Sequence, residues 1–170
     1  MTSERPQQRI ERKTQNMNYA NHFHVGILVA DITVAIDRFS DVLGVRFTEP
    51  AEQITTLHDP DPIECRVRAS YSLGEPPYLE LVEAQGDGVL SLRHGEGLHH
   101  LGYWAPDFET YRDSDAGVKL PAGPRFCLAA GAPTMWLTDP RNLHGVRLEL
   151  VNSALRDGLE AGLAVGRMSG

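Results

Sequence analysis

Cysteine and long apolar runs are both scarce in this chain of 170 residues. Its two cysteines, Cys65 and Cys127, are too few and too widely separated for a Cys-x-x-Cys site, so we expect free thiols in a reducing compartment. No apolar run approaches the roughly 20 residues of a membrane-spanning helix, and the first residues lack the apolar core of a signal peptide. These features predict a soluble, cytoplasmic protein without a membrane partner.

Positive charge is also in deficit. The chain has 16 Lys and Arg residues against 23 Asp and Glu residues, a formal net charge of −7, and its isoelectric point is near 5.4. Because proteins bind nucleic acids mainly through basic patches, this balance argues against a nucleic-acid partner. With 41% hydrophobic residues, a chain of this length predicts one globular unit, which can consist of two half-domains around a shared core.

One sequence pattern occurs twice. Residues 24–32 align without a gap on residues 100–108, with identical His, Gly and Asp positions, and the Leu-Glu-Leu-Val of residues 79–82 recurs at residues 148–151. Such a repeat determines the architecture, because each copy forms one structural module. Each copy places a His near its start and a Glu near its end, and two His with two Glu form a ligand set for a hard divalent metal ion.

The repeat divides the chain into modules. An apolar strand is expected at residues 24–29, followed by an N-cap at Asp31 and an amphipathic helix that ends at Gly44. The second copy predicts a similar strand and a cap at Asp107, with a shorter helix. The expected domains are a mobile polar tail (1–21), a first module (22–84), a linker (85–97), a second module (98–152) and a C-terminal tail or short helix (153–170).

Alternation along the strands places the four candidate ligands on one face. Glu80 and Glu149 alternate with leucines that pack under a helix, and His24 and His100 lie opposite their apolar neighbours. A lone His or Glu on a strand is more often hydrogen-bonded or solvated, but four at matched positions favour a shared metal site. The glycine two residues after each His, at positions 26 and 102, leaves room beside the imidazole. The same alternation assigns the opposite face to Glu83 and His99.

These motifs resemble the vicinal oxygen chelate superfamily. The resemblance rests on His-Val-Gly-Ile and the helix after it, Leu-Glu-Leu-Val, His-His-Leu-Gly-Tyr, and the Asp-Pro that precedes Gly-Val-Arg-Leu-Glu-Leu-Val, and it covers nearly all of residues 23–152. It implies an α+β fold in which two βαβββ modules, related by pseudo-twofold symmetry, form a curved, incompletely closed sheet or barrel around a metal cleft. It also implies a homodimer.

The resemblance further implies a metal centre. The family's ligand positions fall on His24, Glu80, His100 and Glu149, which would hold one divalent ion of Zn, Co, Ni, Mn, Mg or Fe. A set of four ligands is most similar to the glyoxalase I and methylmalonyl-CoA epimerase branch. The sequence departs from the family pattern in its short second helix and in a longer final turn at residues 141–144, where a substrate pocket would be shaped.

Such a centre predicts chemistry on a small molecule that has a carbonyl beside a second oxygen. A six-coordinate ion would keep two adjacent positions for this substrate, and its Lewis acidity would stabilise an enolate. Glu149 is the first candidate for the base and Glu80 the second, so an epimerase, isomerase or lyase of the glyoxalase type is expected. The expected pocket residues, which suit an apolar or aromatic substrate, are Trp104, Phe126, Met135, Trp136 and His144.

Two other functions stay open at the level of sequence. An iron-dependent dioxygenase would contain iron and would consume oxygen when its substrate is added. A non-catalytic protein that binds a small molecule or an antibiotic would hold its ligand tightly without a metal.

Overall fold

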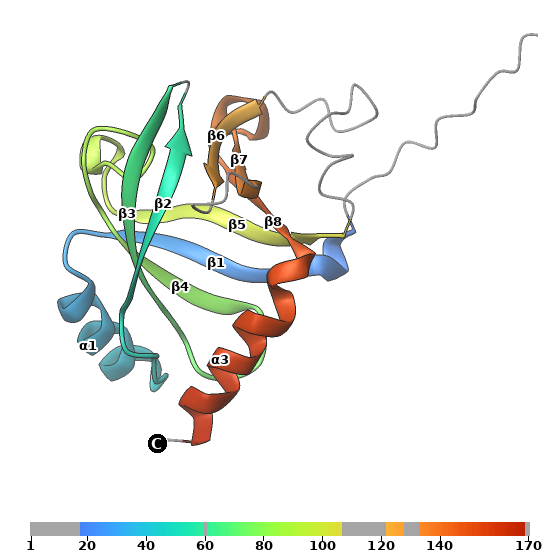
Figure 1. Ribbon diagram of the computed structural model, residues 1–170. Helices are drawn as coiled ribbons and strands as arrows, with labels where there is room; N and C mark the ends of the chain where they lie inside the picture. Colours follow the sequence, from blue (N-terminus) through green and yellow to red (C-terminus); the bar gives the residue numbers. More distant parts are fainter. Residues whose placement is uncertain (1–17, 60, 107–121, 128–132, 169–170) are drawn as a thin grey trace, which may run out of the picture.

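Eight strands form a closed barrel in the computed structural model, which describes residues 18–59, 61–106, 122–127 and 133–168 (Figure 1). The first module contains β1 (His22–Val29), α1 (Ile32–Leu43), β2 (Ala51–His58), β3 (Pro62–Tyr71) and β4 (Tyr78–Glu83). The second contains β5 (Gly97–Ala105), β6 (Ala122–Cys127), β7 (Pro133–Thr138) and β8 (Arg147–Asn152), and α3 (Arg156–Met168) follows.

The two modules have the same strand connections. In the first, β1 pairs in parallel with β4, and antiparallel pairs continue through β3 to β2. In the second, β5 pairs in parallel with β8, and antiparallel pairs continue through β7 to β6. The halves join at β1–β5 and again at β2–β6. The predicted α+β fold of two related modules is therefore confirmed, and the β2–β6 pairing closes the ring that we expected to be incompletely closed.

Helix α1 covers the outside of the first module. The Asp31 side chain accepts hydrogen bonds from the backbone N–H groups of Thr33 and Val34, and Gly44 ends the helix at a φ of 68°, a left-handed conformation that glycine adopts at little cost. Ile32 is fully buried against Val29 and Leu81. These contacts occupy the outer face of β1 and β4, so the alternate residues of the same strands point into the barrel.

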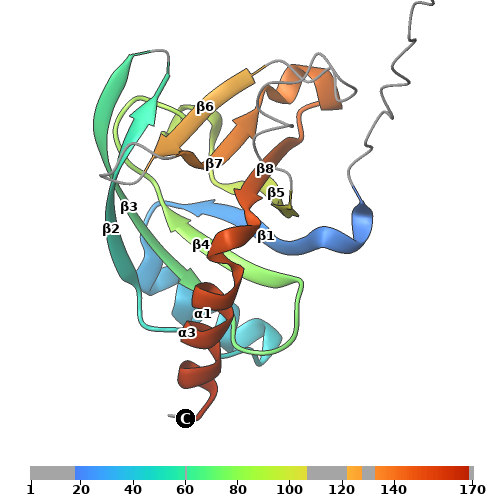
Figure 2. The ribbon, with the colours of Figure 1, turned by 45° about the vertical axis from the view of Figure 1, so that its right-hand side comes forward.

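The C-terminal helix α3 packs against strands of both modules. α3 runs beside β4 in both views of the molecule (Figures 1 and 2). Its residue Leu163 is buried in a cluster with Phe23 and Trp104, and Leu155 and Leu159 pack against this cluster. The helix therefore forms part of the wall around the interior.

Two predicted segments cannot be compared with the structure. The cap at Asp107 and the helix after it lie outside the described residues, as does most of the predicted tail, residues 1–17. Residues Tyr19–Asn21 of that tail form a single turn of 3-10 helix. In the described part of the chain, no helix is long and apolar enough to cross a membrane.

Candidate metal centre

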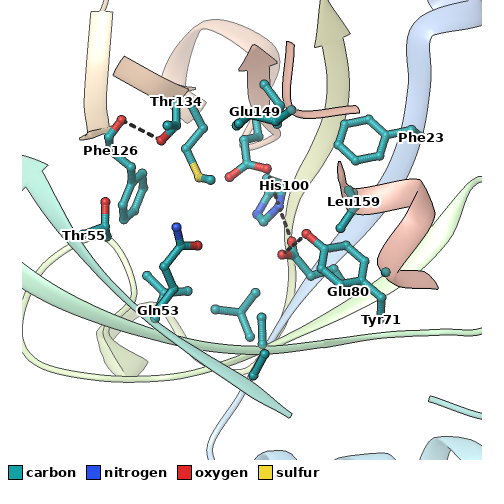
Figure 3. A pocket seen from close by; sticks show the side chains of 18 of the residues that line it. Phe23, Gln53, Thr55, Tyr71, Glu80, His100, Phe126, Thr134, Glu149 and Leu159 are labelled. Carbon is teal, nitrogen blue, oxygen red and sulfur yellow. Dashed lines mark hydrogen bonds and ion pairs between the residues drawn. The ribbon is translucent and has the colours of Figure 1, made fainter. Parts of the chain in front are cut away.

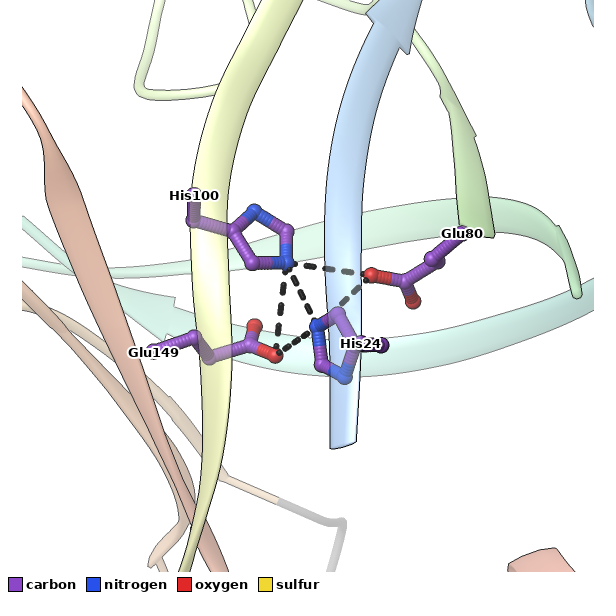
Figure 4. A group of neighbouring side chains, drawn as sticks. All are labelled: His24, Glu80, His100 and Glu149. Atoms are coloured by element: carbon purple, nitrogen blue, oxygen red, sulfur yellow. Dashed lines mark hydrogen bonds and ion pairs between the residues drawn. The ribbon is translucent and has the colours of Figure 1, made fainter. Parts of the chain in front are cut away.

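The four candidate ligands converge inside the barrel. His24 on β1, Glu80 on β4, His100 on β5 and Glu149 on β8 each offer a ligand atom, and these atoms all lie within 4.8 Å of one another (Figure 4). The Nε2 atoms of the two histidines are 2.8 Å apart. The Oε2 atoms of Glu80 and Glu149 each lie 3.1 to 3.5 Å from both of these nitrogens. All four side chains are buried.

Strand register explains why these residues meet. Gly26 on β1 has Glu80 on one side and His100 on the other, and Gly102 on β5 has His24 and Glu149. Residues in one row across a sheet point to the same face. Two adjacent rows, each with a central glycine, therefore deliver the four ligands from strands that are far apart in sequence.

The central glycines are required by space. A Cβ atom on Gly26 would lie 2.1 Å from Cε1 of His100, and one on Gly102 would lie 2.0 Å from Cε1 of His24. No side chain fits at such distances unless the imidazole moves. The predicted role of these glycines is thus refined, because each one accommodates the imidazole of the opposite module.

Two β-bulges bring further residues to the centre. The β1–β5 register shifts between His22 and His24 and again between Gly26 and Ile27, where it passes from His100 to Leu98, so Phe23 and His99 are each an extra residue. A bulge re-aims the side chain of the extra residue. His99, which simple alternation assigned to the outer face, is instead buried beside His100 and lines the interior cavity.

A chain of hydrogen bonds orients the His100 imidazole. Nε2 of His99 lies 2.9 Å from the carbonyl oxygen of Val89, which can only accept, so this nitrogen carries the proton. Burial lowers the pKa of His99 to about 4, with the charge of His100 as the next cause, so His99 is neutral near pH 7. Its Nδ1 then accepts from Nδ1 of His100 over 2.9 Å. The lone pair of His100 that is available for a metal is therefore on Nε2, the atom that faces the cluster.

Glu80 is held by a tyrosine that the sequence reasoning did not identify. The Tyr71 hydroxyl donates to Oε1 of Glu80 over 2.5 Å, while Oε2 of the same carboxylate faces both imidazoles. Burial raises the pKa of Glu80, but the charge of His24, the hydrogen bond and charge of His100 and the hydroxyl of Tyr71 outweigh it and hold the pKa well below its ordinary value. Glu80 is therefore a persistent carboxylate with both oxygens engaged.

The donor set fits a divalent ion. When two ligand atoms each lie roughly 2.1 Å from an ion and the angle between them at the ion is a right angle, the two atoms are roughly 3 Å apart. The distance of 2.8 Å between the Nε2 atoms of His24 and His100 is close to this value. Burial lowers the pKa of His100, but the carboxylates of Glu149 and Glu80 raise it overall, so the cluster favours positive charge at its centre. Two imidazoles and two carboxylates would hold such an ion with zero net charge.

The cluster opens into a cavity of about 450 Å³ (Figure 3). Trp104, Phe126 and Met135 line this cavity, as predicted from the sequence, but Trp136 and His144 do not. Alternation along β7 directs Met135 inward and Trp136 outward, where Trp136 packs with Tyr103 and Leu150. His144 is exposed in the turn before β8.

Comparison with known proteins identifies the family of this arrangement. Residues 23–132 match the Glyoxalase/Bleomycin resistance protein/Dioxygenase superfamily. No curated protein sequence matches the chain.

Solved structures share the fold. Methylmalonyl-CoA epimerase from Mycobacterium tuberculosis is 24% identical with a TM-score of 0.55, over 83% of this chain and 93% of that one. A variant of the Streptomyces coelicolor methylmalonyl-CoA epimerase in complex with 2-nitronate-propionyl-CoA is 21% identical with a TM-score of 0.52, over 79% of this chain and 97% of that one. A hypothetical protein from Bacillus halodurans C-125 is 18% identical with a TM-score of 0.54, over 77% and 92%. At these identities the likeness shows the fold alone.

Proposed function

The chain belongs to the Glyoxalase/Bleomycin resistance protein/Dioxygenase superfamily, and on that premise we propose that it is a divalent-metal-dependent enzyme that moves a proton beside a carbonyl group, as an epimerase, isomerase or lyase. The observation that carries the proposal is the buried cluster of His24, Glu80, His100 and Glu149 at the wall of a cavity large enough for a small molecule. The epimerases among its structural neighbours support this choice within a superfamily whose name also includes dioxygenases.

The chain's own residues have distinct roles in this reaction. A divalent ion bound by the four ligands would supply a Lewis acid for the substrate carbonyl oxygen. Glu149 is the proposed base. Among the described residues, it contacts both imidazoles through Oε2. Its other oxygen, Oε1, can therefore take the proton from the substrate and return it. Glu80 is less suited to this role, since Tyr71 and both imidazoles stabilise its charged form.

Metal content is the first test. Untagged wild-type protein and a His100→Ala/Glu149→Ala variant are purified in parallel and their bound metals are measured. We expect about one divalent ion per chain in the wild type and almost none in the variant. A wild-type site that is empty and cannot be refilled would contradict the proposal and would favour a binding protein.

Proton exchange is the second test. The metal-loaded protein is incubated in deuterium oxide with simple, uncharged α-hydroxyketones, and deuterium beside each carbonyl is measured by NMR. We expect metal-dependent exchange that Glu149→Gln abolishes although the metal stays bound. Iron in the site together with substrate-dependent oxygen uptake would favour a dioxygenase instead.

A further inference from the structure

The cavity beyond the metal cluster has mostly apolar walls. Glu80, His100 and Glu149 line it, while His24 is fully buried behind them. Figure 3 shows Phe126 on the side away from Tyr71 and Glu80. Strands on all sides of the barrel and α3 contribute further apolar lining residues, which include Phe23, Trp104, Met135, Val151, Leu159 and Leu163. A ligand that reaches the cluster therefore has its remaining atoms in apolar surroundings.

The charges around the cavity do not favour an anionic ligand body. Among the described residues that line it, the ionised side chains are carboxylates, those of Glu49, Glu80 and Glu149. The two cluster carboxylates together neutralise a divalent ion, so the ion leaves no excess positive charge for a second anionic group. A carboxylate or phosphate on the ligand body would lie against apolar walls or near Glu49, where its desolvation is not compensated.

α3 presents a recess to this cavity. Gly158, Leu159, Gly162 and Leu163 line the cavity, and their spacing places them on one face of α3. Leu155, at the end of the 3-10 turn before α3, lines it too. A Cβ atom on Gly158 or Gly162 would meet no atom within 4 Å. Glycine is less favourable than alanine inside a helix, and here two glycines one turn apart leave open volume between leucines.

We propose that this site takes a ligand with an uncharged, apolar body, which chelates at the metal cluster through two adjacent oxygens and lies along the glycine face of α3. The inference rests on the proposed function, because it assigns a substrate class to the same site. It adds two specificity-determining positions, Gly158 and Gly162, and it excludes ligands whose body is anionic.

Hydroxamates of increasing length test the ligand class. They chelate divalent metals through two adjacent oxygens, and in Co²⁺-loaded protein their binding changes the visible spectrum of the ion. Acetohydroxamate, hexanohydroxamate, octanohydroxamate and the monohydroxamate of octanedioic acid are titrated into the wild type. We expect Kd to fall by up to roughly fourfold for each methylene that becomes buried, and the terminal carboxylate to cancel this gain. Equal Kd values for all chain lengths, or tight binding of the carboxylate probe, would overturn the proposal.

A matched pair of α3 variants tests the recess. Gly162→Leu fills the glycine face, whereas Ala161→Leu adds a similar side chain at the neighbouring position of the same helix, which does not line the cavity. We expect Gly162→Leu to remove most of the chain-length gain while acetohydroxamate binds as in the wild type, and Ala161→Leu to change neither. An unaltered chain-length gain in Gly162→Leu would contradict the assignment of α3.

The two proposals fail in different ways. Failure of the wild type to bind cobalt or acetohydroxamate contradicts the metal-dependent function. The recess is then tested without a metal, by thermal shift with 1-octanol. Stabilisation of the wild type and the Ala161→Leu variant but not of Gly162→Leu supports an apolar ligand, and the same response in all three proteins overturns it.

Discussion

In the first half of the barrel the residue before the ligand histidine is Phe23, and in the second half it is His99. Both residues are the extra residue of a β-bulge, and both line the cavity. Phe23 stacks on Trp104 with ring centroids 3.8 Å apart and meets the His24 ring edge to face at 4.3 Å. His99 instead hydrogen-bonds the His100 ring. Packing thus supports one imidazole, while a polar chain supports the other.

The carboxylates differ in the opposite sense. The cross-strand partner of Glu80 is Tyr71, which donates a hydrogen bond to it, and the corresponding partner of Glu149 is Leu137, a buried core residue. Each half therefore supports one member of the cluster with a hydrogen bond from a neighbouring side chain. In the first half Tyr71 supports the Glu80 carboxylate, and in the second half His99 supports the His100 imidazole. Backbone register places all four candidate ligands equivalently, but their neighbours distinguish them: among the described residues, the tyrosine hydrogen bond is made to Glu80.

Loss of either histidine should have the largest effect. We expect His24→Ala and His100→Ala each to remove nearly all bound metal, because the four candidate ligands form one centre and each imidazole offers one of its four ligand atoms. Elemental analysis of the dialysed proteins measures this. His22→Ala is the control, since His22 lies on the same strand and donates to the carbonyl oxygen of His24, outside the four-residue cluster. Full metal content in His24→Ala would show that the halves are not equivalent as ligand donors.

The reciprocal glycine contacts give the next effect. Gly26→Ala should destabilise the metal-free protein by about 1–3 kcal/mol, because its Cβ would collide with the buried ring of His100. The cost should largely disappear in a His100→Ala background, but it should persist in a His24→Ala background. Urea unfolding of these variants forms a double-mutant cycle. Gly102→Ala should show the mirror pattern, with rescue by His24→Ala, and an absence of rescue in both cycles would contradict the crossed arrangement.

Much of this architecture follows from local sequence signals. The repeat identifies the two modules and the four residues of the candidate metal centre, and Asp31 and Gly44 define the ends of α1. These signals work because capping and alternation depend on neighbours in sequence. Alternation also requires the neighbours Met135 and Trp136 to face opposite sides of the sheet. The prediction that both line the pocket was therefore wrong for Trp136, and the sequence alone was enough to show that only one of them could.

Other features depend on non-local pairing. The face of His99 is decided by a bulge in the β1–β5 ladder, and the only sequence signal is that His-His-Leu-Gly in one copy corresponds to Phe-His-Val-Gly in the other. Tyr71 meets Glu80 because of the β3–β4 register, and β2–β6 pairing closes the barrel. The homodimer and the domain boundaries stay predictions.

Replacement of His99 by phenylalanine, the residue type at the corresponding position 23 of the first module, should have an intermediate effect on metal affinity. His99→Phe removes the acceptor for the Nδ1 proton of His100, and loss of such a partner typically weakens metal binding by about 10- to 100-fold. His99→Gln retains an acceptor oxygen and should restore most of the affinity. Competition with a chelator measures the affinity, and the Nδ1 proton of His100 in Zn-loaded protein gives an independent NMR signal. Equal losses in both variants would indicate that His99 serves only to pack the core.

Tyr71→Phe should have the smallest effect, and its pH dependence identifies the cause. The Glu80 pKa is depressed in the folded protein, so this carboxylate contributes stability above its unfolded pKa, near 4.5, that is lost as pH falls toward the folded pKa. The Tyr71 hydroxyl is one source of that depression, so Tyr71→Phe should cost about 1 kcal/mol at pH 7 and less at pH 3. Urea unfolding of metal-free protein at both pH values measures the difference, with Tyr103→Phe, whose ring lies in a cluster with Trp136, as the matched control. A cost that is independent of pH would assign Tyr71 to packing alone, and the two carboxylates would then be equivalent candidates for the base.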